Sequence, residues 1–256
     1  MIECVALVTN KLYIETTIST IKQIRLVGEY DGIILLLIGN DLKNCIKDYD
    51  IDNNLVIKYF EDIDRSEYIE IYKNKPISDG REINKIFQWH KLYLFHPWIK
   101  ENFDKCFYID AGVKIFKNIG KFMNQNCENK LIAHSDSYPT YEWKLSIQFD
   151  KIQFPELFNE LSYSYNLQID YFQSTIMLFD TKIISDSTFD ELIVLSKKWI
   201  NSRTNEQAIM NLYFNCYKKV WAPSLIKDED TYYYDFFERG NLRCDDYIML
   251  KYPKTN

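Results

Sequence analysis

Short apolar runs alternate with longer helical patterns through the first half of the sequence. Mainly apolar runs span residues 3–9, 32–38, 55–60 and 105–109. Between them, residues 13–27 and 81–103 carry apolar side chains at helical spacing. This alternation predicts parallel strands whose faces are covered by helices. We therefore expect an α/β fold with a central sheet flanked by helices.

The second half of the sequence is less regular. Residues 131–134 and 172–179 are expected strands, residues 186–201 and 205–214 are expected helices, and little periodicity follows Trp221. No internal repeat and no Gly-, Ser- or Pro-rich linker marks a boundary. The 256 residues therefore predict one domain. Residues 1–125 are its expected ligand-binding half, and residues 126–256 complete the cleft.

Composition excludes several classes of partner. The chain has 31 Lys and Arg against 37 Asp and Glu, a net charge of -6, which argues against nucleic acid polymers. Glu3 lies where a signal peptide carries positive charge, and no apolar run approaches the ~20 residues of a membrane helix. Six scattered cysteines form no C-x-x-C pair, so we expect reduced thiols in a cytoplasmic protein. Nothing in the sequence indicates an oligomeric state.

Polar and acidic residues follow the predicted strands, at the edge where open α/β sheets bind ligands. Thr9 and Asn10 follow the first strand, and Asp110 follows the apolar fourth strand. The second and third strands are followed by Asn40, Asp41, Glu61 and Asp62. Such a concentration of carboxylates in an anion pocket requires a metal ion or a lysine nearby.

A lysine lies in the predicted helix before the fourth strand. Phe87, Lys91, Phe95 and Trp98 fall at positions i, i+4, i+8 and i+11 and so share one helix face. A cation among aromatic residues either extends to water or faces a buried anion. Both alternatives are open for Lys91, and the candidate anions are a phosphate group and Asp110.

The segment from Trp89 to Ile119 resembles the central signature of GT-A glycosyltransferases, most closely those of family 8. Residues 103–105, 108–111 and Val113 match that signature position by position. Two further motifs follow in the same order: DYFQSTIMLFD at residues 170–180, and NEQAIMN at residues 205–211. The resemblance covers residues 80–215.

This resemblance implies a Rossmann-like GT-A domain with a mixed, mainly parallel sheet. It implies transfer of a sugar from a nucleotide-diphosphate donor, with a UDP-sugar expected, to a glycan, protein or small-molecule acceptor. It also implies Mn²⁺ or Mg²⁺ held by Asp110 against the diphosphate. The expected nucleotide-binding residues are Thr9, Asn10, Lys91, Asp110, Ala111 and Gly112, and the expected catalytic residues are Asp110, Gln173 and Glu206.

The sequence also departs from the family pattern. Gly112 lies where the family has its second aspartate, so metal dependence is open. The family's late histidine has no counterpart, and the tail offers only acids as ligands: Asp228, Asp230, Asp245 and Asp246. A degenerate protein that binds a sugar nucleotide or glycan is therefore the alternative. A nucleotidyltransferase is disfavoured, because the first strand is not followed by a Gly-rich, basic loop.

Three smaller sequence features also predict local structure or function. Thr204 and Gln207 have the spacing of a capping box, with Thr204 as N-cap, which competes with a functional role for Gln207. Residues 251–254 (KYPK) resemble a lysine-proline pattern that covers the diphosphate, but a solvated chain end is the favoured interpretation. His134, at a strand end, is a candidate for acceptor binding.

Overall fold

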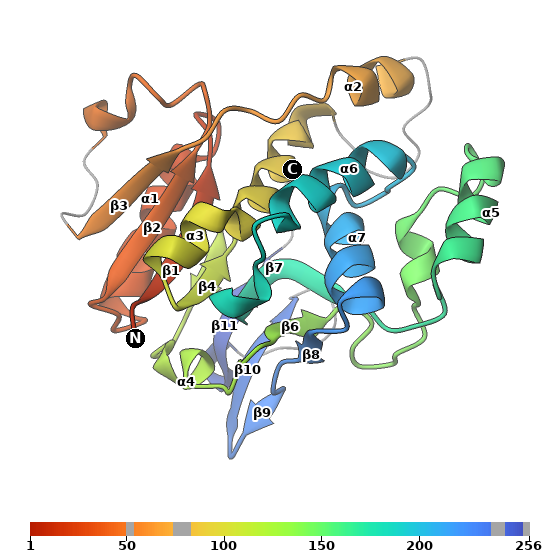
Figure 1. The fold of residues 1–256 in the computed structure, drawn as a ribbon. Coiled ribbons are helices and arrows are strands. Elements are labelled where there is room, and N and C mark those ends of the chain that lie inside the picture. The colour runs from red at the N-terminus through yellow and green to blue at the C-terminus, as the bar shows by residue number, and fades with distance from the viewer. Residues whose placement is uncertain (50–53, 74–82, 237–243, 253–256) are drawn as a thin grey trace.

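The computed structural model describes residues 1–49, 54–73, 83–236 and 244–252, which form an α/β fold with two sheets (Figure 1). The larger sheet has seven strands in the order β3-β2-β1-β4-β7-β6-β8. These strands are β1 (Glu3–Thr9), β2 (Ile33–Ile38), β3 (Leu55–Tyr59), β4 (Lys105–Ile109), β6 (Leu131–Ser135), β7 (Phe172–Asp180) and β8 (Trp221–Pro223). Strands β3, β2, β1 and β4 are parallel, whereas β7 is antiparallel to both of its neighbours. The predicted mixed, mainly parallel sheet is confirmed.

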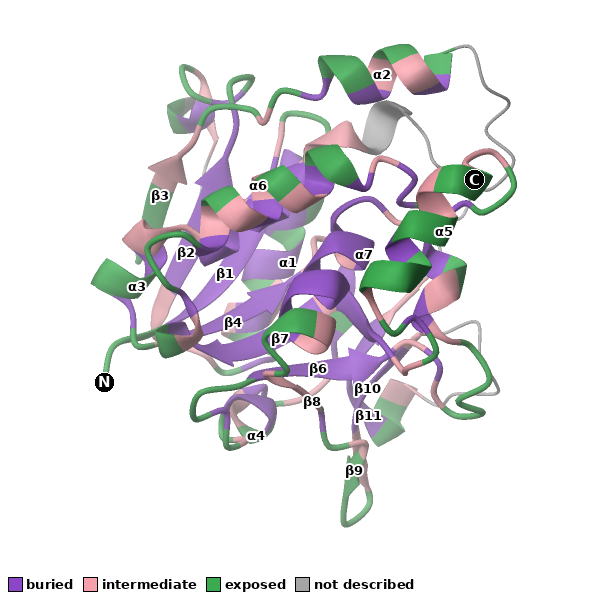
Figure 2. Cartoon of the chain, turned by 45° about the vertical axis from the view of Figure 1, so that its right-hand side comes forward, coloured by how far each residue is buried: buried purple, intermediate pink, exposed green. Residues whose placement is uncertain are grey.

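The apolar runs of the first half form the central strands, as expected. In β1, β2 and β4 every residue after the first is buried, because helices or the second sheet cover both faces. Such strands need no alternation of polar and apolar side chains, and their continuous apolar character is the signal that identifies them. Figure 2 shows this buried sheet in purple between more exposed helices.

Helices cover both faces of the sheet. The α-helices are α1 (Ile14–Leu26), α2 (Ser66–Lys73), α3 (Pro97–Asn102), α4 (Gly120–Met123), α5 (Pro155–Ser164), α6 (Thr188–Lys198) and α7 (Glu206–Met210). One core cluster contains residues of α2, α6 and α7, and the other contains residues of α1 and α4. Short 3₁₀ turns occur at η1 (Ile46–Asp48), η3 (Leu145–Gln148), η4 (Thr181–Ile183) and η7 (Cys244–Asp246). Within the described residues, no helix is long and apolar enough to cross a membrane.

Two predicted helices differ from a regular α-helix. The segment predicted as helical over residues 81–103 is split into a 3₁₀ helix, η2 (Ile83–Phe95), and α3; residues 81 and 82 lie outside the described part. His96 begins α3, since its ring accepts a hydrogen bond from Trp98 N and Pro97 occupies the first helical position. The segment predicted over residues 205–214 is α7 followed by a π-helix, η5 (Asn211–Tyr217).

A second sheet lies beside the first and was not predicted. Its order is β5-β11-β10-β9, with β5 (Val113–Ile115), β11 (Tyr247–Lys251), β10 (Thr231–Phe236) and β9 (Lys227–Asp228). Its buried residues, such as Tyr233, Ile248 and Met249, pack in the core cluster that contains α1. The strand β11 pairs with β5, directly after the Asp110 motif. The C-terminal part of the chain is thereby brought to the ligand edge of the larger sheet.

Candidate active site

Four charged side chains meet at the carboxyl end of β4. Lys91 Nζ lies 2.9 Å from Asp110 Oδ1 and 2.9 Å from Glu206 Oε1. Lys251 Nζ lies 3.9 Å from Asp110 Oδ2 and donates a 2.8 Å hydrogen bond to the carbonyl oxygen of Ala111. The Lys91 and Glu206 side chains are 8% and 3% exposed, whereas those of Asp110 and Lys251 are each 21% exposed. A buried ion-paired core therefore has a more open side at Asp110 and Lys251.

The position of Lys91 decides between the two interpretations of its sequence pattern. Its helix, η2, places the ammonium between Asp110 and Glu206, and the residue is buried. Extension to water is therefore wrong for this lysine, and a buried anion is its partner. The hydroxyl of Tyr108 also donates to Asp110 Oδ1, which leaves that carboxylate oxygen with two donors.

The antiparallel strand β7 brings the second motif to Asp110. Ile109 of β4 pairs with Ile176 of β7, so the carboxyl end of β4 lies beside the first half of β7. Asp110 N donates a 2.9 Å hydrogen bond to the carbonyl oxygen of Thr175. Ser174 Oγ in turn lies 3.2 Å from Glu206 Oε1. Backbone pairing therefore sets the distance between the motifs around Asp110 and Glu206.

The surroundings shift the pKa values of the two carboxyl groups in opposite directions. Burial raises the pKa of Glu206, and Lys91 offsets only part of that rise. Burial acts in the same direction on Asp110, but the attraction of Lys91 and Lys251 outweighs it, so the pKa of Asp110 is lowered. Burial alone would lower the pKa of Lys91, yet the two carboxylates raise it above its ordinary value. Opposite shifts of neighbouring carboxyl groups are typical of acid and base pairs in active sites.

Glu206 has an unsatisfied oxygen. Within the described part of the chain its Oε2 atom is buried and has no hydrogen-bond partner. A buried carboxylate oxygen without a donor is costly unless a ligand supplies one. Glu206 Oε2 is therefore a candidate contact for a hydrogen-bond donor of a ligand.

The residue before Glu206 has a strained backbone. Asn205 has φ 51° and ψ -124°, a conformation that non-glycine residues rarely adopt. Its side chain accepts a hydrogen bond from Tyr68 OH at 3.2 Å and donates one to Gln88 Oε1 at 2.8 Å. These contacts hold the turn that points Glu206 at Lys91. Strain of this kind concentrates at functional sites.

The predicted capping box is wrong. Asn205, and not Thr204, is the N-cap of α7, and no side-chain cap bond forms there among the described residues. The hydroxyl of Thr204 instead donates to Gln148 Oε1. Gln207 Oε1 accepts a 3.0 Å hydrogen bond from Ser174 N, and its Nε2 atom donates to Gln148 Oε1 at 3.1 Å. Gln207 therefore joins α7 to β7 and does not cap its own helix.

Gln173 lies near this cluster but is held by other residues. Its Nε2 atom donates to Asp136 Oδ1 at 2.5 Å, and its Oε1 atom accepts from Tyr234 OH at 3.1 Å. The neighbouring His134 is buried, with its ring edge-on to Tyr138 and Tyr234. Tyr234 was not expected at the site, and no sequence motif identified it.

The other predicted nucleotide-binding residues lie on the same edge. Strands β1 and β4 are parallel neighbours, so the end of β1 lies beside the end of β4. Thr9 Oγ1 accepts a 2.8 Å hydrogen bond from Thr17 Oγ1, and Asn10 Oδ1 is buried without a partner among the described residues. Gly112 has φ +82°, in the left-handed region, and its N–H donates to Thr20 Oγ1 at 3.0 Å. Asn10 thus presents a second unsatisfied acceptor at this edge.

Three of the other candidate acids have partners outside this cluster. Asp41 Oδ2 accepts from Lys11 N at 2.8 Å, and Asp62 Oδ1 accepts from Asn40 N at 3.0 Å, so both acids order loops. In the tail, Asp228 lies 3.8 Å from Lys121, and both side chains are about half exposed. The expectation of a solvated chain end is wrong for Lys251, which reaches the site; Pro253 and Lys254 lie outside the described residues.

The side chains around Asp110 do not fit the expected divalent cation. Mn²⁺ and Mg²⁺ need several oxygen ligands, and like charges nearby oppose their binding. Asp110 Oδ1 already faces Lys91 and the Tyr108 hydroxyl, and Oδ2 faces Lys251, while position 112 has no carboxylate. In the described ranges no group of three or more His, Cys, Asp or Glu side chains could hold a metal ion.

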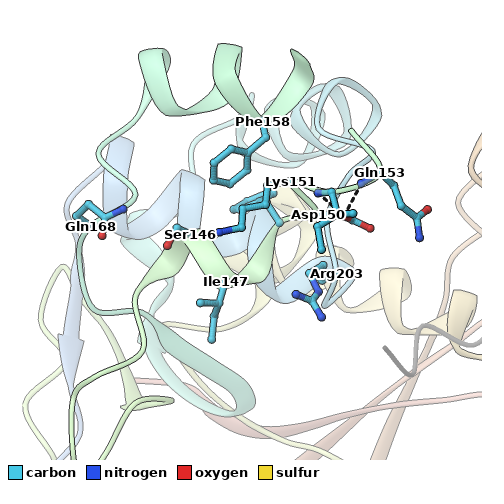
Figure 3. Close-up of a pocket in the computed structure, with 10 residues that line it drawn as sticks. Ser146, Ile147, Asp150, Lys151, Gln153, Phe158, Gln168 and Arg203 are labelled. Carbon is cyan, nitrogen blue, oxygen red and sulfur yellow. Dashed lines mark hydrogen bonds between the residues drawn. The ribbon is translucent and has the colours of Figure 1, made fainter. Parts of the chain in front are cut away.

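A separate cavity of about 440 Å³ is shown in Figure 3. Its lining includes both sequence neighbours of Gln148, the residue that contacts Thr204 and Gln207. Lys151 and Arg203 line it together with apolar side chains that include Ile147 and Phe158. Asp150 caps its own loop, because Oδ1 accepts from the backbone N–H groups of residues 152 and 153. Arg203 N donates to the carbonyl oxygen of Gln148 at 2.7 Å. The cavity is thus one residue away from the glutamine that contacts Gln207.

Comparison with known proteins identifies the fold. No protein-family profile matches the sequence, and no curated protein matches it. Among solved structures, the chain is similar to the galactosyltransferase LgtC in complex with donor and acceptor sugar analogs, with TM-score 0.60, 12% identity, and coverage of 97% of this chain and 86% of that one. An LgtC variant in which an active-site glutamine is replaced by glutamate gives TM-score 0.61, 11% identity, and coverage of 98% and 88%.

The bifunctional glycosyltransferase WbbM is also similar, with TM-score 0.57 and 15% identity. The match covers 100% of this chain but only 46% of WbbM, so it concerns one part of that larger protein. At these identities the similarity defines the architecture. Together with the mixed sheet and the order of its strands, it shows that this chain has the GT-A fold of glycosyltransferases.

Proposed function

We propose that this protein is a glycosyltransferase that moves a sugar from a nucleotide-diphosphate donor to an acceptor. The observation that carries the proposal is the Lys91, Asp110 and Glu206 cluster at the carboxyl end of β4, in a chain with the GT-A fold. A UDP-sugar is the expected donor, and a glycan, protein or small molecule is the expected acceptor. The similar LgtC structure contains donor and acceptor sugar analogs, which supports substrates of this class.

The nucleotide is proposed to bind along the ends of β1 and β4. Asn10 has a buried acceptor that suits an N–H or hydroxyl of the nucleoside. The backbone of Ala111 and Gly112 can approach the diphosphate closely, because Gly112 has no side chain. Thr9 contributes indirectly, since its hydroxyl fixes the turn that carries Asn10.

The sugar is proposed to lie against Glu206 and Asp110. Glu206 Oε2 would accept a hydrogen bond from a sugar hydroxyl and so satisfy its buried oxygen. Asp110 remains ionised next to the reacting centre because Lys91 and Lys251 lower its pKa. Lys91 is a positioning residue that fixes both carboxylates, and Gln173 offers the second N–H of its amide to a sugar hydroxyl.

Residues 126–256 are proposed as the acceptor side. The cavity lined by Lys151 and Arg203 belongs to this half, and its volume of about 440 Å³ lies in the range of small-ligand sites. The contacts from Gln148 through Gln207 to Ser174 connect it with Glu206. All six cysteines are free, which fits the cytoplasmic location expected from their spacing.

The test is a panel of nucleotide sugars with and without candidate acceptors, with release of free nucleotide as the measurement. Turnover of at least one nucleotide sugar, and binding of its nucleoside diphosphate by calorimetry, are the expected results. If no nucleotide sugar or nucleoside diphosphate binds, the proposal is wrong. Binding without turnover on any acceptor would favour the degenerate binding protein, the alternative that Gly112 suggests.

A further inference from the structure

The turn that leads into Glu206 has a geometry that glycine usually supplies. Gln207 N donates a 3.2 Å hydrogen bond to the carbonyl oxygen of Thr204, which closes a four-residue β-turn. Asn205 is the second residue of this turn, and its φ of 51° and ψ of -124° are those of a type II′ turn at that position. A residue with a Cβ atom is strained there, and glycine is the usual choice. The side-chain contacts of Asn205 must therefore offset this strain.

The side chain of Asn205 connects the turn to two other elements. The residue is 5% exposed. Its Oδ1 atom accepts a 3.2 Å hydrogen bond from Tyr68 OH of α2, and its Nδ2 atom donates a 2.8 Å bond to Gln88 Oε1 of η2. Its carbonyl oxygen also accepts a 2.6 Å bond from Ser202 Oγ. Glycine at this position would keep only the last of these three bonds, so the contacts with α2 and η2 depend on the amide.

The helix η2 contacts the same turn a second time. Gln88 and Lys91 are three positions apart, and side chains with that spacing lie above one another in a 3₁₀ helix. Gln88 bonds to Asn205, and Lys91 Nζ lies 2.9 Å from Glu206 Oε1. One face of η2 therefore contacts two successive residues of the turn. Loss of the first contact would free the backbone of Glu206 to move relative to Lys91 and Asp110.

We infer that Asn205 is a positioning residue of the active site, whose side-chain amide sets the place of the Glu206 carboxylate, and that Tyr68 acts through it from α2. This inference rests on the proposed transferase function. Displacement of a reacting group by about 1 Å can lower a rate by about 10²-fold. The proposed nucleotide contacts come from residues 9–10 and 110–112, so binding of UDP should not depend on Asn205.

Two substitutions of Asn205 separate backbone strain from the role of the amide. Asn205→Gly and Asn205→Ala both remove the amide, but only glycine adopts a positive φ without a steric penalty. The midpoint of urea unfolding should therefore be higher for Asn205→Gly than for Asn205→Ala. Turnover of the donor should nonetheless fall by about 10- to 100-fold in both variants. The Kd of UDP, measured by calorimetry, should stay unchanged.

The contribution of α2 is tested by Tyr68→Phe, with Tyr72→Phe as the matched control. Each substitution removes a buried hydroxyl of the same helix that donates a hydrogen bond, from Tyr68 to Asn205 and from Tyr72 to the carbonyl oxygen of Ile200 at 3.0 Å. Both variants should have a lower urea midpoint, because each leaves a buried acceptor without its donor. Only Tyr68→Phe should also lower turnover, by up to about 10-fold.

The possible results separate this inference from the proposed function. If Asn205→Gly turns over the donor as the natural protein does, the positioning role is wrong and the transferase function stands. The same holds if the Kd of UDP rises in step with the loss of turnover, or if Tyr72→Phe lowers turnover as much as Tyr68→Phe. If the natural protein neither binds UDP nor releases nucleotide from any nucleotide sugar, both proposals fail. Should circular dichroism show that Asn205→Ala does not fold, turnover by Asn205→Gly and Tyr68→Phe decides the question.

Discussion

Replacing Lys91 with methionine should destabilise the protein far more than removing a surface lysine. The substitution keeps an apolar stem of similar length but removes the charge between Asp110 and Glu206. At 2.9 Å and an effective dielectric constant of about 20, each pair attracts by roughly 6 kcal/mol before desolvation is subtracted. Because desolvation cancels part of that attraction, the net cost of leaving a buried charge unpaired is about 3–5 kcal/mol. That cost is a large fraction of a typical folding free energy of about 5–15 kcal/mol.

The assay is urea unfolding followed by tryptophan fluorescence, with two comparison variants. Lys198→Met is the matched control, since Lys198 and Glu160 are also ion-paired, at 2.8 Å, but about half exposed. Its expected cost is at most about 1 kcal/mol. The double variant Lys91→Met, Glu206→Gln should recover about 2 kcal/mol or more, because the glutamine leaves no unpaired buried charge at Glu206.

The pH dependence of the unfolding free energy of Lys91→Met supplies a second test of the buried ion pairs. Burial already raises the pKa of Glu206, and loss of Lys91 removes the main opposing effect. A raised carboxyl pKa means that the folded state holds its proton, so stability falls as the pH rises through that pKa. The destabilisation by Lys91→Met should therefore be smaller at pH 5 than at pH 7. A cost within 1 kcal/mol of Lys198→Met, or no recovery in the double variant, would refute the buried-pair reasoning.

Three further predictions follow from single residues. Asp110→Ala should lower nucleotide release by roughly 10²-fold or more, and near-normal activity would remove Asp110 from the site. Burial lowers the pKa of His90 to about 4, so unfolding free energy should drop by roughly 3 kcal/mol from pH 6.5 to pH 4, and His90→Gln should flatten that dependence in urea unfolding. Gly112→Ala should cost about 1–2 kcal/mol of stability through its positive φ alone, since space for a Cβ exists, and an unchanged urea midpoint would contradict this.

The central sheet could be predicted because its strands are buried on both faces. Residues 3–9 and 105–109 are continuous apolar runs, and the structure places β1 and β4 at those positions. The site could be predicted in part, because strand ends collect ligands and Asp110 directly follows the buried strand β4. The motif resemblance added Glu206, which lies 96 positions from Asp110 and has no local signal of its own.

The second sheet could not be predicted for a physical reason. Its strands are short, and β10 (TYYYDF) carries tyrosines on successive positions, so neither alternation nor a continuous aliphatic run marks it. Lys251 was assigned to a solvated end because its place is defined only by the pairing of β11 with β5, in which Lys251 faces Val113, 138 positions earlier in the sequence. Thr204 was predicted as the N-cap of α7 in place of Asn205. The positive φ of Asn205 is accompanied by hydrogen bonds to Tyr68 and Gln88, which lie far from it in sequence and give no local signal.

The buried cluster also has a consequence for how the protein folds. Lys91 and Asp110 belong to the first half of the chain, whereas Glu206 comes from the second. An intermediate in which α7 had docked before Lys91 was in place would bury Glu206 without its cation, which is costly. The favourable state is therefore reached only when both halves are in place. These ion pairs form only after the long stretches of chain between the three residues have closed. We therefore expect the site to assemble late in folding.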